Sequence, residues 1–477
     1  MNRHGGNDAL SSDRTVGRRS LLKAAGATAL ASTLAATTAG RASATEELAW
    51  DAIVIGAGYA GGTAARELAA RGMRTLVLEA RGRIGGRIWT GSFAGEQVEI
   101  GGGWFGPGQT NVERELQRYN ITTSHDVAAT RAVMPSGTGF TSQAPADAFG
   151  HLGTLFGQFY AGSETYFERP LEPLYRQDLL ASVDATSLAA RLGQLGLSTT
   201  DQKWINGSTS VFAGGPSSTG GLAGMAQWYQ LAGGTYDGFL STMSLKPAGG
   251  MISLLQAMLA GSTARVRYNS PVTAITQGST GLTTVKTASG VSFRAPVVVV
   301  AVPVNVWRTI TFNPGLPQVH ADAALEGVGV PTATKIWLQV TGVSDAVYAQ
   351  APEGSPILMM LPQKQLADGS RLYVAFAGAG LNVSDAVAVQ AAVRNLVPEA
   401  TVVTYRAMQW GKDTYTRGGW ALRKPGQLLR QLPAIQQPHG SMVFAGSDIA
   451  SGWYGAFVEG AIESGLRAAQ QAAVIAG

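Results

Sequence analysis

The sequence predicts an α/β fold with at least two domains, and three observations support this expectation. The chain has 477 residues, more than a single hydrophobic core usually supports. Its hydrophobic content of 45%, its ordinary charge and its 62 glycines indicate a globular protein rich in tight turns. Residues 49–81, AWDAIVIGAGYAGGTAARELAARGMRTLVLEAR, have the order strand, glycine-rich turn, helix and strand.

This segment has the features of a Rossmann-like dinucleotide site. The apolar strand from Ala52 to Ile55 leads into Gly56-x-Gly58-x-x-Gly61, whose glycines allow a tight turn, close approach of a diphosphate and close helix–strand packing. The helix N-terminus favours the phosphate charge. Glu79 follows Gly58 by 21 residues, where an acid can accept hydrogen bonds from the ribose hydroxyls. The residues expected to bind the dinucleotide here are Gly56, Gly58, Tyr59, Ala60, Gly61 and Glu79.

Two further glycine-rich stretches favour FAD over NAD. RGRIGGRIWT at 81–90 places Arg81, Arg83 and Arg87 around a glycine pair. The charge and the close backbone approach would let this second segment of the chain contact a diphosphate. EIGGGWFGPGQ at 99–109 offers a turn able to lie against a flat ring, with Gly102, Gly103 and Trp104 at its centre. Together, LEARGRIGGRIWT and GGGWFGP resemble the flavin amine oxidase family, the monoamine-oxidase-like flavoenzymes.

The resemblance continues along nearly the whole chain after the N-terminus. ARVRYNSPVTAITQ at 264–277 is similar to a returning strand whose valine, here Val272, meets the adenine. MVFAGSDIASGWYGAFVEGAIESGLRAA at 442–469 resembles the C-terminal flavin segment, which implies contacts from Ser447, Asp448 and Val458 and a helix at about 456–470 directed at the flavin. Within the family, 167–173 and 212–239 most resemble bacterial nicotine and pseudooxynicotine oxidases.

The resemblance implies an amine oxidase type of fold in which the FAD-binding domain is discontinuous. We expect that domain to comprise 45–127, 241–303 and 412–477. The α+β substrate domain would then comprise 128–240 and 304–411, with a helical part first and a sheet contributed by 334–341 and 371–377.

Family members line the space before the flavin with two aromatic residues. YTRGGWALRKPG at 415–426 places Trp420 at the first position, and Gly419 falls where the mitochondrial enzymes have a cysteine bonded to the flavin. Because the chain has no cysteine, we expect the FAD to be bound non-covalently. For the second position, counting back from EGA at 459–461 gives Phe457, whereas counting forward from Trp453 gives Ala456; Phe457 is preferred because it restores the second ring.

Lys335 lies in PTATKIWLQVTG at 331–342, where the alternation predicts a β-strand with Lys335 and Trp337 on one side. The residues alone leave two interpretations: an ammonium that reaches solvent along an apolar stem, or one aimed inward. The resemblance favours the second, because the family carries a lysine here that holds a water against flavin N5. The resemblance therefore implies Lys335, Trp420 and Phe457 as catalytic residues.

The N-terminus resembles a twin-arginine export signal, predicted at 1–44. GRRSLLK at 17–23, with Arg18 and Arg19, precedes a weakly hydrophobic run and a small-x-small site, ASA, at 42–44. The run is too short and polar to predict stable membrane insertion. Residues 1–44 carry six basic and two acidic residues, which leaves 30 against 29 in the remainder, so the charge does not favour a nucleic-acid role. A periplasmic or secreted flavoprotein is expected.

The sequence predicts an oxidoreductase that converts a primary or secondary amine into an imine, with O2 or a redox protein as electron acceptor. One alternative is an L-amino-acid oxidase of the same fold, with Arg169 or Arg176 clamping the substrate carboxylate. Another is a flavoprotein-fold binding protein without turnover. No serine-hydrolase elbow occurs, a metal site is not expected, and a homodimer is left open. The histidines, which lack metal-ligand spacing, are His4, His125, His151, His320 and His439.

Overall fold

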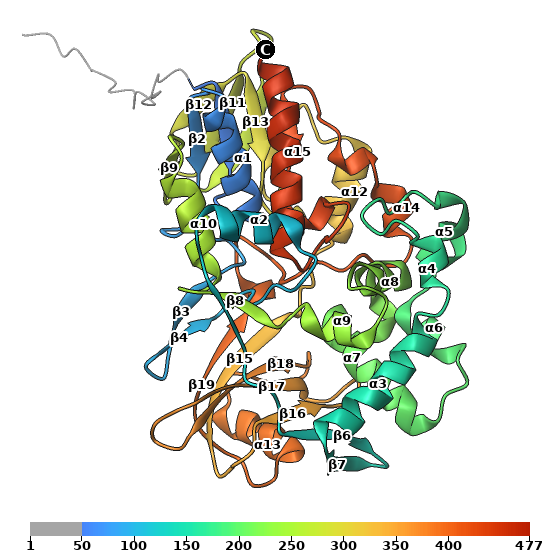
Figure 1. Cartoon of the computed structure of the whole chain (residues 1–477). Coiled ribbons are helices and arrows are strands. Elements are labelled where there is room, and N and C mark those ends of the chain that lie inside the picture. The colour runs from blue at the N-terminus through green and yellow to red at the C-terminus, as the bar shows by residue number, and fades with distance from the viewer. Residues whose placement is uncertain (1–49) are drawn as a thin grey trace, which may run out of the picture. The chain divides into compact units, whose positions relative to one another are not determined.

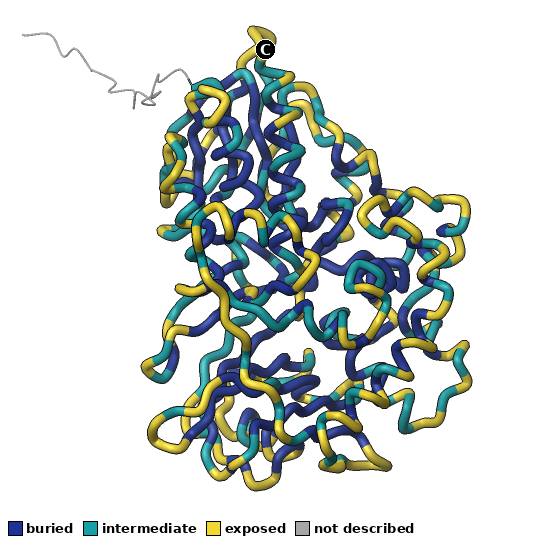
Figure 2. The backbone as a smooth tube through the Cα atoms, in the orientation of Figure 1, coloured by how far each residue is buried: buried dark blue, intermediate teal, exposed yellow. Residues whose placement is uncertain are grey.

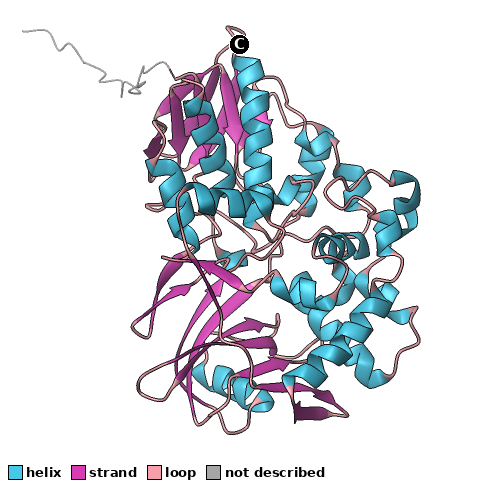
Figure 3. Cartoon of the chain, in the orientation of Figure 1, coloured by secondary structure: helices cyan, strands magenta, loops and turns pink. Residues whose placement is uncertain are grey.

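The computed structural model describes residues 50–477, and the predicted export signal lies outside this range. The described chain forms three larger sheets and two short strand pairs, with helices around them (Figures 1 and 3). No helix within 50–477 is long and apolar enough to cross a membrane.

A five-stranded parallel sheet carries the dinucleotide motif. Its order is β20 (Met442–Phe444), β13 (Val297–Val300), β1 (Ala52–Ile55), β2 (Thr75–Leu78) and β9 (Arg265–Arg267). Strands β1, β2 and β13 are buried along their whole length, as apolar runs in a covered parallel sheet should be. The predicted strand, helix and second strand are thus confirmed, with the helix as α1 (Tyr59–Ala70).

Helices α1 and α15 (Val458–Ala476) lie side by side against this sheet (Figure 1). A Cβ at Gly465 would stand 2.5 Å from the Ala60 carbonyl oxygen, so a glycine is what lets the two helices approach this closely. The predicted C-terminal helix is therefore present, but it begins at Val458, two residues later than expected.

A second sheet has four strands of mixed direction, in the order β12 (Ser292–Ala295), β11 (Thr283–Thr287), β10 (Val272–Gln277) and β14 (Thr311–Asn313). Because β14 pairs in parallel with β10, the chain returns to this sheet after β13 and leaves it only past Asn313. Two strand pairs complete this part: β3 (Thr90–Phe93) with β4 (Glu96–Glu99), and β5 (Thr123–His125) with β8 (Leu245–Pro247).

The largest sheet has seven strands and contains the two strands predicted at 334–341 and 371–377, which are confirmed as β15 and β18. Its order is β19 (Thr401–Gln409), β15 (Thr334–Thr341), β18 (Arg371–Ala377), β17 (Ile357–Gln365), β16 (Val347–Gln350), β6 (Arg131–Ser136) and β7 (Gly139–Gln143). We expected a helical part first in 128–240, but two strands precede the helices: β6 pairs with β16, and β7 pairs with β6.

Both faces of this sheet are packed, so alternate residues of β15 contribute to apolar clusters on opposite sides of the sheet. Ile336, Leu338 and Val340 belong to one apolar cluster, and Trp337 belongs to the other, larger cluster. In Figure 2 the central strands of the five-stranded and seven-stranded sheets are mostly dark blue, which marks them as buried. Lys335 therefore shares its side of the strand with Trp337, as predicted.

Short and medium helices join these sheets. Between β7 and β8 lie α3 (Pro145–Phe159), α4 (Ser163–Tyr166), α5 (Gln177–Asp184), α6 (Leu188–Gly193), α7 (Thr199–Ala213), α8 (Leu222–Leu231) and α9 (Tyr236–Ser241). The others are α2 (Thr110–Arg118), α10 (Met251–Ala260), α11 (Val304–Trp307), α12 (Gln318–Glu326), α13 (Ala386–Leu396) and α14 (Gln427–Gln431). The division into FAD-binding and substrate domains stays a prediction.

Candidate active site

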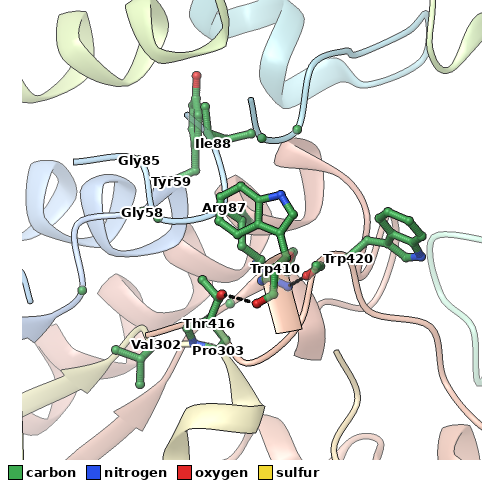
Figure 4. Close-up of a pocket in the computed structure, with 18 of the residues that line it drawn as sticks. Gly58, Tyr59, Gly85, Arg87, Ile88, Val302, Pro303, Trp410, Thr416 and Trp420 are labelled. Atoms are coloured by element: carbon green, nitrogen blue, oxygen red, sulfur yellow. Dashed lines mark hydrogen bonds between the residues drawn. The ribbon is translucent and has the colours of Figure 1, made fainter. Parts of the chain in front are cut away.

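A cavity of about 480 Å³ runs from the β1–α1 turn to β15 and the aromatic residues around it. In the view of Figure 4, Gly58, Gly85 and Tyr59 lie on one side and Trp420 on the other, with Arg87 and Trp410 between them. The sequence-predicted residues that line it are Gly56, Gly58, Tyr59, Ala60, Glu79, Arg81, Arg87, Gly102, Gly103, Trp104, Val272, Lys335, Trp420, Ser447, Phe457 and Val458. Gly61 and Asp448 do not line it.

The three glycines of the turn have different structural roles. Gly56 has φ +101°, a conformation that favours glycine. A Cβ at Gly61 would lie 1.9 Å from the Gly56 carbonyl oxygen, so Gly61 lets α1 pack on the turn and needs no contact with the cavity. Gly58 has an extended backbone, and its Cβ would meet nothing nearer than the Gly85 oxygen at 3.8 Å. Neither strain nor packing requires a glycine at 58, whereas a diphosphate in the cavity would.

Glu79 is buried at the cavity wall and oriented by the backbone. Its two carboxylate oxygens accept one hydrogen bond each, from the Ala57 amide at 2.9 Å and the Arg81 amide at 2.8 Å. Each oxygen can accept a further hydrogen bond, so the carboxylate remains able to bind two ribose hydroxyls. The turn, the helix N-terminus and Glu79 together fit the dinucleotide half of a flavin cofactor.

Arg87, in the second glycine-rich stretch, contacts two C-terminal segments of the site, one at Gly419 and one at Ser447 and Asp448. It donates to the Gly419 carbonyl oxygen at 2.9 Å and to Ser447 Oγ at 3.0 Å, and it pairs with Asp448 Oδ1 at 2.7 Å. Asp448 also accepts from the Val304 amide at 3.1 Å. Asp448 thus lies behind Arg87, which explains why Ser447 lines the cavity and Asp448 does not.

The two predicted aromatic residues, Trp420 and Phe457, lie on the cavity wall, and so does Ala456, the alternative to Phe457. Trp420 donates its indole N–H to the Phe212 carbonyl oxygen at 2.6 Å, which fixes the ring. Phe457 packs edge-on against Trp453 and Trp228, with ring centroids 4.7 Å and 5.5 Å away. Ala456 also lines the cavity, so the two residues proposed for the second position are neighbours on one wall.

Lys335 is buried, with 4% of its surface exposed, so the solvent-facing interpretation is wrong. Its Nζ donates to the Gly101 carbonyl oxygen at 2.8 Å and lies 4.6 Å from the centre of the Trp104 ring. Burial, together with the ammonium of Lys246, lowers the pKa of Lys335 to about 7, although Glu99 and Asp126 act in the opposite direction. The group can therefore exchange a proton near neutral pH.

The structure adds aromatic residues that the sequence analysis did not identify. Further rings on the cavity wall are Phe212, Trp228, Phe239, Phe376, Trp410 and Tyr415. Three of them, Phe212, Trp228 and Phe239, fall in the segment 212–239, which most resembles the nicotine and pseudooxynicotine oxidases. That resemblance could have indicated that these rings line the substrate cavity. For Trp410 and Phe376 no local pattern distinguishes a cavity residue from a core residue.

The arginines suggested as a carboxylate clamp do not lie at the cavity. Arg169 is exposed, stacks on Tyr175 and pairs with Glu172. Arg176 pairs with Asp178 at the surface. Within residues 50–477, no three acidic or histidine side chains gather closely enough to hold a metal ion.

Fold and cavity together fit a flavin-dependent oxidoreductase, and comparison with known proteins shows the family. Residues 59–473 match the family of flavin containing amine oxidoreductases, and the chain belongs to that family. The predicted family and fold are thus confirmed, and the protein is an enzyme that works with a flavin.

Individual relatives share most of their length with this chain. It is 34% identical over 428 residues to the nicotine dehydrogenase of Pseudomonas putida, covering 88% of each chain. It is 32% identical over 438 residues to a pseudooxynicotine dehydrogenase of a Pseudomonas species, covering 89% of this chain and 86% of the relative. Among solved structures, a putrescine oxidase bound to putrescine matches with a TM-score of 0.74 at 23% identity, over 90% of this chain and 99% of that one. That likeness shows the fold.

Proposed function

We propose that this enzyme is an exported, FAD-dependent amine oxidase that converts a primary or secondary amine of modest size into an imine, which water then hydrolyses. A bound FAD would supply the acceptor for the hydride equivalent that leaves the carbon next to the amine nitrogen, with O2 or a redox protein as the final electron acceptor. The observation that carries the proposal is that Lys335, Trp420 and Phe457, from distant segments, line one cavity with Gly58 and Glu79.

The residues of the chain favour FAD held without a covalent bond. The Gly58 turn and Glu79 fit the dinucleotide, as argued above, and the chain contains no cysteine. At Gly419, where the resemblance places the attachment cysteine of other members, a Cβ would stand 2.5 Å from the Ala333 Cβ. A side chain at position 419 would require Ala333, which directly precedes β15, to shift.

The cavity wall favours an uncharged amine. Glu79 is the one acidic side chain among the residues that line the cavity, and it lies at the dinucleotide end. An ammonium group among the rings of Trp420 and Phe457 would therefore lack a carboxylate partner, and burial in apolar surroundings disfavours the charged form. Rings held by hydrogen bonds and neighbouring rings can orient the amine with little motion.

The burial of Lys335 at the cavity wall supports a role in holding a proton or a water there. Its one hydrogen-bond acceptor, the Gly101 oxygen, leaves two of the three N–H groups of the ammonium form for other partners. Neither Arg169 nor Arg176, the arginines suggested for an amino-acid carboxylate, lines the cavity, so the amino-acid oxidase alternative loses the support of those two residues. The names of the relatives place nicotine and pseudooxynicotine in the first substrate panel.

An anaerobic screen tests the proposal directly. The purified yellow enzyme is mixed with a panel of amines and L-amino acids, and the absorbance of the oxidised flavin is followed. We expect one or more amines to bleach the flavin and amino acids to leave it unchanged. Bleaching by amino acids alone would replace the amine oxidase with an amino-acid oxidase.

The variant Lys335→Met tests the catalytic residue. We expect FAD occupancy near wild type and a rate of flavin reduction or reoxidation lower by ~10²–10³, the usual cost of losing one positioned donor at a reacting centre. Stopped-flow mixing separates the two half-reactions, and Lys364→Met, whose lysine pairs with Glu96 at the surface, is the control. Turnover within about threefold of wild type, only ~0.6 kcal/mol, would remove Lys335 from the mechanism.

A further inference from the structure

A charged cluster beside Trp104, outside the residues that line the cavity, is not explained by cofactor or amine binding. Lys246, in β8, forms an ion pair with Asp126, which directly follows β5, and donates to Gln363 Oε1 at 2.6 Å. Asp126 also accepts from Gln363 Nε2 at 3.1 Å and from the indole N–H of Trp104. Figure 1 shows β8 where the nucleotide-binding part meets the seven-stranded sheet.

The cluster shares an aromatic ring with Lys335. The Nζ of Lys246 lies 5.3 Å from the centre of the Trp104 ring, and the Nζ of Lys335 lies 4.6 Å from the same centre. The two ammonium groups are therefore no more than about 10 Å apart, a distance at which charges in a protein still interact strongly. Lys335 itself has no carboxylate at ion-pair distance among the described residues.

We propose that Lys246 and Asp126 are positioning residues whose opposing charges balance each other at Lys335, so that the loss of either one alone changes the proton affinity of Lys335 and the pH range in which the amine oxidation runs. The pair is nearly neutral as a whole, because Asp126 balances Lys246. Each member is about one-fifth exposed. The inference rests on the proposed role of Lys335.

Three charged groups act on the proton affinity of Lys335. Glu99, at the end of β4, favours the ammonium, as does Asp126, whereas Lys246 opposes it. Glu99 is itself buried and accepts from the Met251 amide and Thr90 Oγ1. On the strands paired with β15, the residues in register with Lys335 are Phe376 and Met408, which carry no charge.

The experiment measures the proton on Lys335 directly, in the enzyme with its flavin. The chain has eight lysines, so lysine labelled with ¹³C at Cε gives a small set of NMR signals, and Lys335→Met assigns the one that matters. Lys246→Met should raise the proton affinity of Lys335 by on the order of tenfold, because it leaves Asp126 unbalanced at this distance. Asp126→Asn should lower it by a similar factor.

Two further variants separate charge from structure. The double variant Lys246→Met/Asp126→Asn removes both charges and should return Lys335 close to its wild-type titration. Lys246→Arg keeps the charge and should also leave it unchanged. The pH profile of flavin reduction should move with the NMR titration in each case. Shifts of the same sign in both single variants, or none in either, would overturn the proposal.

The titration reads the proton without any turnover. If the substrate class is wrong but the coupling is right, the opposite shifts still appear in the NMR signals. If the coupling is wrong, the shifts are missing whatever the enzyme oxidises. The two failures are therefore distinguishable.

Discussion

Two glycines three residues apart in the dinucleotide turn should fail in opposite ways when each becomes alanine. A Cβ at Gly61 would stand 1.9 Å from the Gly56 carbonyl oxygen, a backbone atom that cannot move without opening the turn. A Cβ at Gly58 would have room within the protein, since its nearest neighbour is 3.8 Å away and its φ of −80° suits any residue. It would stand in the cavity where we place the diphosphate.

The magnitudes follow from these distances. Gly61→Ala should lower the free energy of unfolding by about 1–3 kcal/mol or more, the range for overpacking in a well-packed region. Gly58→Ala should cost the flavin-stripped protein less than ~1 kcal/mol, the loss of a favourable helix N-cap residue. Its FAD affinity should fall roughly 10- to 150-fold, which corresponds to one charge-assisted hydrogen bond of about 1.5–3 kcal/mol.

Urea unfolding of the flavin-stripped proteins and titration with FAD, followed by quenching of flavin fluorescence, give the two numbers for each variant. The reasoning predicts a stable Gly58→Ala that binds FAD weakly and an unstable Gly61→Ala. An FAD dissociation constant for Gly58→Ala within about twofold of wild type would show that the diphosphate does not lie against this turn.

Three other predictions follow from the proposals. Acid precipitation should release all the flavin into the supernatant because no cysteine is present, and yellow precipitate would contradict this. Lysine at both Arg18 and Arg19 should retain the precursor in the cytoplasm, as followed by cell fractionation, and unchanged export would remove the twin-arginine interpretation. From pH 7 to 9 the free energy of unfolding of the wild-type protein should rise relative to that of Lys335→Met, by at most ~1.4 kcal/mol per pH unit. The reason is that Lys335 keeps its proton in the unfolded chain but has lost it in the folded protein, where burial lowers its pKa. A difference in unfolding free energy between the two proteins that stays constant with pH would contradict the lowered pKa.

The local elements of the fold could be predicted from the sequence because their signals are local. The strand 52–55, the glycine turn and the helix after it form from neighbouring residues, and the alternation around Lys335 correctly predicts a strand. The hairpin β6–β7 was missed, because β7 has the sequence GFTSQ, with little apolar alternation. Its pairing depends on β16, more than 200 residues away in the chain.

The cavity could be predicted only where a motif carries its residues. Gly58, Glu79 and Trp420 lie in recognisable patterns, and they line the cavity. Lys246 and Asp126 have no such pattern, since a lysine in a short strand and an aspartate after another are usually surface residues. Their relation to Lys335 exists only because β5 and β8 pair beside Trp104.

The position of Lys335 does not depend on its charge alone. Residues 335 and 337 share one side of β15, and both bind the backbone of the glycine-rich turn: Lys335 donates to the Gly101 oxygen and the Trp337 indole donates to the Glu99 oxygen, each at 2.8 Å. The strand is thus held to the turn at two points, and the loss of one leaves the other. For this reason Lys335→Met should keep the cavity wall and the FAD in place, so that any loss of rate in that variant measures the chemistry of the ammonium group and not the collapse of the site.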